Sequence, residues 1–274
     1  MSDDDDAGES LWGRTEMKRF SYTVAVPGTD TQTDPVVLTA VQDREVCAGT
    51  PAFPSHGHCV WDAALLLADY LQAKASDTTQ SNGRSDDHAR FHFQDKKVVE
   101  LGAGVGLVGM ALAVLGARVV LTDQNYALPL LNKNVAANFL NREESEPSAP
   151  SVATVVPVVE ACQWGEPFES CGHLQRWAKS TDVVVFSDVL YHESAFLLLI
   201  KTLHELVSPS TDVFFSFETR STTIEANFLC KLEETFDVEL ISREANARVF
   251  ASFDYPEELF LYHARLKDAT AEHE

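Results

Sequence analysis

Cysteine, basic side chains and long apolar runs are all scarce in this chain of 274 residues. Its five cysteines are an odd number without paired spacing, which is typical of reduced thiols in an intracellular protein and argues against a disulfide framework. No apolar run approaches the ~18 residues that a membrane-spanning helix needs. The chain begins Met-Ser and four aspartates, whereas a signal peptide begins with a basic and then an apolar region. We therefore expect a cytoplasmic protein, with the nucleus as a second location, and no membrane partner.

Acidic side chains outnumber basic ones two to one: the chain has 42 Asp and Glu and 21 Lys and Arg, which gives a net charge of −21. Such a chain repels nucleic-acid phosphates, so we expect no nucleic-acid partner. The charge suits a basic protein surface as partner, and the alternative is that it serves solubility alone. The run His56-Gly57-His58-Cys59 resembles a chelating group, but it lacks a second ligand group at useful spacing. We therefore expect no metal site.

The length and the apolar fraction of 45% fit one α/β domain with additions. Period-two alternation at 20–26 and a β-rich run at 36–41, with a Pro-Gly turn signal between them, predict an N-terminal hairpin. The expected organisation is a disordered acidic tail at 1–15, a β extension at 16–58, a main domain at 59–267 with a polar insertion at about 74–95, and a tail at 268–274.

A β/α alternation predicts a Rossmann-like sheet of seven mostly parallel strands with helices on both faces. We expect strands at 97–101, 118–122, 153–158, 182–187, 212–217, 236–241 and 258–265. We expect helices at 60–71, 105–116, 126–139, 172–179, 193–207 and 222–234. The last two strands have no convincing helix between them, which predicts an antiparallel C-terminal hairpin. Asn132, Asn134 and Asn138 are expected to contact solvent or loops.

A glycine-dense turn follows the strand at 97–101. Gly102, Gly104 and Gly106 let the backbone approach a ligand closely. Asp123, at the end of the next strand, can accept two hydrogen bonds from a ribose diol. We therefore expect the chain to bind an adenosine-containing small molecule; the alternative is that the glycines only make a tight strand-to-helix turn.

Two cofactors fit this turn. Residues 104–109 match the dinucleotide fingerprint, and Asp123 lies roughly 20 residues further on, where a ribose-binding acid is expected. Residues 102–106, preceded by Glu100, match the turn that binds S-adenosylmethionine instead. A carboxylate at Glu100 suits a cationic ligand better than a pyrophosphate, although the glycine motif alone leaves both cofactors open.

Several motifs occur in a characteristic order along residues 55 to 265. They are Val60-Trp61-Asp62-Ala63-Ala64-Leu65, Glu100-Leu101-Gly102-Ala103-Gly104, Leu121-Thr122-Asp123, Asn132-Lys133-Asn134, Trp164-Gly165 and Ser187-Asp188-Val189-Leu190-Tyr191. Together they resemble the class I, seven-β-strand protein lysine methyltransferases of methyltransferase family 16. The resemblance implies S-adenosylmethionine as cofactor and a lysine-exposing intracellular protein as substrate, of the chaperone, ATPase or translation factor class. We expect the protein to act as a monomer.

The resemblance also implies roles for single residues. The expected cofactor-binding residues are Trp61, Glu100, Gly102, Gly104, Gly106, Asp123 and Trp164. Asp188 and Tyr191 match the motif beside the transferred methyl group, and Arg220 weakly matches an arginine after the fifth strand. Val105 stands where Thr is common, and the polar insertion leaves the substrate unassigned.

Methyl transfer to lysine needs a neutral amine, since a free lysine has a pKa near ~10.4. An apolar channel lowers that pKa by disfavouring the charged form. We expect Asp188 to dock the incoming ammonium and Tyr191 to aim the nitrogen. Methylation of histidine or of a small molecule, a non-catalytic binding module and a nicotinamide dehydrogenase are the alternatives.

Overall fold

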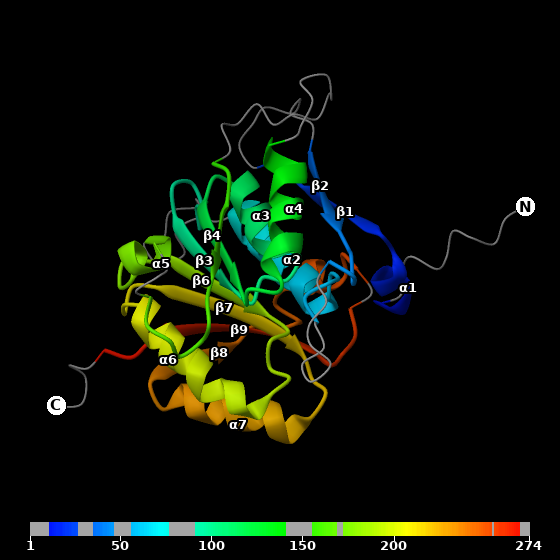
Figure 1. Cartoon of the computed structure of the whole chain (residues 1–274). Coiled ribbons are helices and arrows are strands. Elements are labelled where there is room, and N and C mark those ends of the chain that lie inside the picture. The colour runs from blue at the N-terminus through cyan, green and yellow to red at the C-terminus, as the bar shows by residue number, and fades with distance from the viewer. Residues whose placement is uncertain are drawn as a thin grey trace, which may run out of the picture.

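The computed structural model describes residues 11–26, 35–46, 56–76, 91–140, 155–168, 172–253 and 255–268. Seven strands form one sheet in the order β5-β4-β3-β6-β7-β9-β8 (Figure 1). Their bounds are β3 (Lys97–Leu101), β4 (Arg118–Asp123), β5 (Val158–Ala161), β6 (Val183–Ser187), β7 (Asp212–Glu218), β8 (Phe236–Leu240) and β9 (Leu259–Leu266). The first five of these strands pair in parallel, and β9 is antiparallel to both β7 and β8. The predicted α/β fold with its antiparallel C-terminal hairpin is confirmed.

Helices cover both faces of this sheet (Figure 1). Their bounds are α1 (Leu11–Glu16), α2 (Asp62–Ser76), α3 (Leu107–Val114), α4 (Leu128–Val135), η1 (Ala136–Leu140), α5 (Gly172–Trp177), η3 (Glu193–Ala195), α6 (Phe196–Leu206), α7 (Thr222–Glu233) and α8 (Ala247–Phe250). Side chains of α2, α3 and α4 belong to one buried cluster, and those of α5, α6 and α7 belong to a second. Because side chains alternate across a sheet, Val183 and Val185 of β6 join the first cluster while Val184 and Phe186 join the second.

The predicted N-terminal hairpin is confirmed as β1 (Arg19–Val24) and β2 (Val36–Val41), which pair antiparallel as a separate two-stranded sheet. Contrary to the expectation of solvent contacts, Asn134 and Asn138 are buried, and of the expected loop contacts Asn134 makes one, to Val105 C=O in the glycine turn at 3.1 Å. The Asn134 amide accepts from Val41 N–H at 2.7 Å and donates to Val41 C=O at 3.1 Å, and Asn138 does the same for Thr39 at 2.8 and 2.9 Å. Two side-chain amides thus occupy the hydrogen-bonding edge of β2 as a neighbouring strand would.

A carboxylate in α2 joins segments from the two ends of the chain. Asp69 accepts hydrogen bonds from the hydroxyls of Tyr22 in β1, and of Ser252 and Tyr255 in the loop before β9, each at 2.7 Å. Burial, followed by the Asp69 charge, raises the pKa of both tyrosines, so the phenols remain donors. This junction holds the hairpin and the C-terminal loop against the same helix.

The structure differs from the sequence expectations at several boundaries. Residues 11–15, expected in the disordered tail, belong to α1, because Arg14 is fully buried and forms an ion pair with Asp62. Strand β5 begins at Val158, five residues later than expected, and the short helix α8 lies between β8 and β9. Of the expected polar insertion, 77–90 lie outside the described residues, as do residues 1–10 of the tail and 269–274 at the other end.

Candidate functional site

A cavity of about 410 Å³ opens at the carboxyl ends of the parallel strands β3, β4, β6 and β7. This is the edge at which open α/β sheets bind ligands. Eight of the nine residues predicted for the site line it: Trp61, Glu100, Gly102, Gly104, Asp123, Trp164, Asp188 and Tyr191. Gly106 lies outside the lining and instead caps the start of α3. The roles of these residues stay predictions, but the fold brings them to one place.

The glycine turn depends on backbone conformations that other residues rarely adopt. Gly102 has φ +67°, and a Cβ there would meet a Val189 methyl group at 2.8 Å and the Trp164 ring at 3.4 Å. Gly106 has φ +82°, and a Cβ there would lie 2.6 Å from the Leu131 side chain. A side chain at position 102 would therefore clash with Val189 and Trp164 in the cavity wall. A side chain at position 106 would displace Leu131 of α4.

Glu100 lies beneath this turn with only 2% of its surface exposed. Its Oε2 atom accepts the backbone N–H of Gly109 at 2.7 Å, so the side chain caps the first turn of α3. Burial raises the pKa of Glu100 to about 8. This carboxyl group takes the helix N-terminus that a pyrophosphate would otherwise use, and a positive ligand nearby would stabilise its charged form. The site therefore fits a cationic cofactor rather than a dinucleotide.

Asp123 is positioned by the same turn. Its Oδ2 atom accepts Gly104 N–H at 2.8 Å and its Oδ1 atom accepts Gln124 N–H at 2.7 Å. Each carboxylate oxygen has a further lone pair, so both remain able to accept from a diol. Burial raises the pKa of Asp123, and the two backbone donors oppose that rise.

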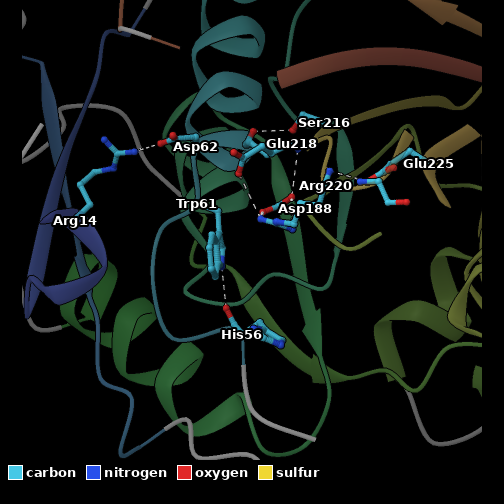
Figure 2. A network of polar contacts seen from close by, with 11 residues as sticks. Arg14, His56, Trp61, Asp62, Asp188, Ser216, Glu218, Arg220 and Glu225 are labelled. Atoms are coloured by element: carbon cyan, nitrogen blue, oxygen red, sulfur yellow. Dashed lines mark hydrogen bonds and ion pairs between the residues drawn. The ribbon is translucent and has the colours of Figure 1, made fainter. Parts of the chain in front are cut away.

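Trp61 and Trp164 form aromatic walls of the cavity. The Trp61 indole N–H donates to the carbonyl of His56 at 2.9 Å, which fixes the ring at the start of α2 (Figure 2). The Arg220 guanidinium lies 5.4 Å from the centre of the Trp61 ring, within cation–π range. Trp164 packs near Gly102, so its indole borders the glycine turn. The Trp61 indole borders the loop before α2 instead.

Asp188 follows β6 in a left-handed conformation, with φ +55°. Its carboxylate is already paired, because Arg220 donates to Oδ1 at 3.2 Å and to Oδ2 at 2.6 Å (Figure 2). The backbone N–H of Glu218 adds a third hydrogen bond at 3.3 Å. Although burial opposes the charge of Arg220, the carboxylates of Asp188 and Glu218 raise its pKa. The position of Arg220 directly after β7 was the only sequence signal for this partner.

Tyr191 carries its phenol to the mouth of the cavity, where 38% of the residue is exposed. Burial of the hydroxyl, followed by the charges of Asp123 and Asp188, raises its pKa, so the hydroxyl stays protonated at neutral pH. The His56 ring centre lies 5.3 Å from that of Tyr191. The sequence places His56 in a run that resembles a metal-chelating group, and its position in the cavity lining was not predicted. Within the described residues, no group of three metal-ligating side chains occurs.

Comparisons with known proteins identify a family that this chain matches. The family profile described as lysine methyltransferase matches residues 49–235. EEF1A lysine methyltransferase 3 of Xenopus tropicalis is 32% identical over 191 residues, which cover 69% of this chain and 70% of that protein. Protein N-lysine methyltransferase METTL21A of Mus musculus is 33% identical over 182 residues, covering 66% and 69%. A solved magnesium protoporphyrin IX methyltransferase from Synechocystis aligns at a TM-score of 0.41 and 15% identity, over 64% of this chain and 72% of that one.

Proposed function

The chain belongs to the lysine methyltransferase family, and from that premise we propose that its cavity transfers a methyl group from S-adenosylmethionine to a lysine of another protein. The observation that carries the proposal is the composition of one cavity. The same cavity is lined by a glycine turn, by the acids Glu100 and Asp123, and by Asp188 and Tyr191. A cofactor and a side chain can therefore meet there.

The cofactor supplies a methyl carbon bonded to a positively charged sulfur, with a neutral thioether as the leaving group. We propose that Gly102 and Gly104 give it a close backbone surface and that Asp123 accepts its ribose hydroxyls. Glu100 lies where its charge would complement a cationic end. Trp61 and Trp164 supply flat apolar walls that exclude water from the reacting atoms.

Asp188 and Tyr191 act on the substrate side of the cavity. Because both oxygens of Asp188 bind Arg220, a lysine ammonium reaches this carboxylate only by sharing it with the guanidinium or by displacing it. We propose that the pair fixes the position of the lysine nitrogen, with the Tyr191 hydroxyl as a further hydrogen-bonding partner. The contribution of these residues is positioning, since methyl transfer moves charge rather than creating it.

We propose a translation elongation factor of the EEF1A type as the first substrate to test, since one relative bears that name. Chaperones and ATPases are the other classes that the sequence motifs imply. The net charge of −21 supports a basic protein partner rather than a nucleic acid, and the odd number and unpaired spacing of the five cysteines support a cytoplasmic location.

The test is to incubate the purified protein with tritiated S-adenosylmethionine, once with purified EEF1A and once with an extract of the host cell. A discrete labelled protein whose label maps to lysine by mass spectrometry is expected. Label on histidine, or on small molecules only, would contradict the proposal.

Asp188→Asn is the matched variant, because asparagine accepts the left-handed backbone that position 188 requires. We expect transfer to fall on the order of 10²-fold through lost positioning of the nitrogen. The dissociation constant for S-adenosylmethionine, measured by calorimetry, should stay within a factor of about 3, which is less than 1 kcal/mol. Equal loss of binding and transfer would contradict the division of roles.

A further inference from the structure

We propose that His56 accepts the proton that the substrate lysine loses before it attacks the methyl group. The proposal rests on the lysine methyl transfer proposed above and assigns a catalytic step to a residue outside the motifs that indicated the family. It follows from which side chains of the cavity are already occupied, and from where His56 lies.

Each carboxyl group that lines the cavity already accepts at least one hydrogen bond from the protein. Asp188 is bound by Arg220 and by a backbone N–H, and its charge is balanced by the guanidinium. Asp123 and Glu100 are held by backbone N–H groups of the glycine turn and of α3, on the cofactor side. A carboxylate also stabilises the ammonium form of lysine, which opposes its deprotonation.

His56 lies in the loop before α2, where its neighbour Gly57 packs against Gly104 of the glycine turn and its own ring reaches Tyr191. It lines the cavity yet is exposed to solvent, and its ring packs against Tyr191. Its carbonyl accepts the Trp61 indole N–H, so the residue is tied to the start of α2 (Figure 2). An imidazole in this place can take a proton from the cavity and release it to water.

The charges around His56 favour its neutral form. Partial burial lowers the pKa of His56, the nearby His192 and the Arg220 guanidinium lower it further, and Asp188 opposes them. Among the described residues, these groups and the Tyr191 phenol are the titratable neighbours that face it. At neutral pH the imidazole therefore has an unprotonated nitrogen, as a proton acceptor requires.

The step balances without a further reagent. One ammonium proton passes to the unprotonated imidazole nitrogen and leaves a lone pair on the lysine nitrogen. That lone pair forms the bond to the methyl carbon, and the carbon–sulfur bond breaks with its electron pair remaining on sulfur. The imidazolium then releases its proton to solvent, and the methylated lysine carries the positive charge.

The test uses the full-length protein, tritiated S-adenosylmethionine and host-cell extract, with label counted in the protein that the wild type modifies. His56→Phe keeps an aromatic ring beside Tyr191 but removes the proton acceptor. We expect its initial rate at pH 7 to fall on the order of 10²-fold, near the lower end for general-base catalysis. At about pH 9.5, where more lysine is already neutral, the loss should shrink to below about 5-fold.

Two controls make the outcome decisive. His92→Gln changes an exposed histidine outside the cavity lining and should keep the wild-type rate at both pH values. Affinity of His56→Phe for S-adenosylmethionine should match the wild type. An equal loss at both pH values, or full activity at pH 7, would overturn the assignment of His56. Absence of any protein labelling by the wild type would instead refute the proposed protein substrate.

Discussion

At Glu100, burial and hydrogen bonding have opposite effects on the pKa of the carboxyl group. Its carboxyl group is removed from water, yet one oxygen accepts the Gly109 N–H that starts α3. With its pKa raised to about 8, the group is largely protonated in the ligand-free cavity at pH 7. A cationic ligand would favour the ionised form, so occupancy of the cavity and the protonation of Glu100 are linked.

This linkage predicts how stability depends on pH. A buried acid whose folded pKa lies above its unfolded value binds protons more tightly when folded, so its contribution falls as pH rises from 4.5 to about 8. Glu100→Gln keeps an acceptor for Gly109 N–H but cannot ionise. We expect thermal melting of the ligand-free variant to depend less steeply on pH between 5 and 8.5 than that of the wild type.

The matched control for this comparison is Glu257→Gln, which removes an exposed carboxylate. Its melting curves should follow those of the wild type at every pH, because the substitution changes only a side chain that is exposed to solvent. Identical pH dependence in wild type and Glu100→Gln would show that the buried acid does not titrate in this range.

Among the secondary-structure elements, the edge of β2 is completed by side chains rather than by a strand. Asn134 and Asn138 lie one helical turn apart, a spacing at which both side chains share a face. Thr39 and Val41 are two residues apart in β2, so their backbone groups point to the same edge. The spacing of the two asparagines along the helix matches the spacing of Thr39 and Val41 along the strand. Side chains of α4 and η1 can therefore hydrogen-bond to the backbone of β2.

Removing one of these amides should destabilise the hairpin. Asn138→Ala removes two partly buried hydrogen bonds to the N–H and C=O of Thr39, at roughly 0.5–1.5 kcal/mol for each bond. Asn132 lies in α4, is exposed, and donates its side-chain amide to Leu128 C=O within the helix, so Asn132→Ala should change stability by no more than about 0.5 kcal/mol. Urea unfolding of both variants measures the difference. Equal stabilities would mean that water replaces the amide.

For the molecule as a whole, the net charge of −21 leads to a prediction about association. If the charge attracts a basic protein substrate, kcat/KM for that substrate should fall several-fold as salt rises from about 0.05 to 0.5 M, because the screening length shortens. Affinity for S-adenosylmethionine, which depends on contacts inside the cavity, should change little. A kcat/KM that is independent of salt would assign the charge to solubility alone.

The sequence predicted most of the sheet, and eight of the nine residues that it assigned to the site line the cavity. Strands such as Val183–Ser187 are continuous apolar runs, and residues at their carboxyl ends necessarily meet at one edge. It did not predict the Asp188–Arg220 pair, whose members are 32 positions apart, or the amide contacts of Asn138 with Thr39, 99 positions away. Side-chain partners of this kind depend on how elements pack, and local patterns carry no record of them.

The junction at Asp69 has a consequence for synthesis on the ribosome. Tyr22 is 47 residues from Asp69 and leaves the ribosome before it, whereas Ser252 and Tyr255 follow 183 and 186 residues later. During translation the N-terminal hairpin can therefore dock on α2 early, while the other two hydroxyls arrive much later. The helix that begins beside Trp61 obtains these two polar partners only after Ser252 and Tyr255 have left the ribosome, so its final packing waits for that segment.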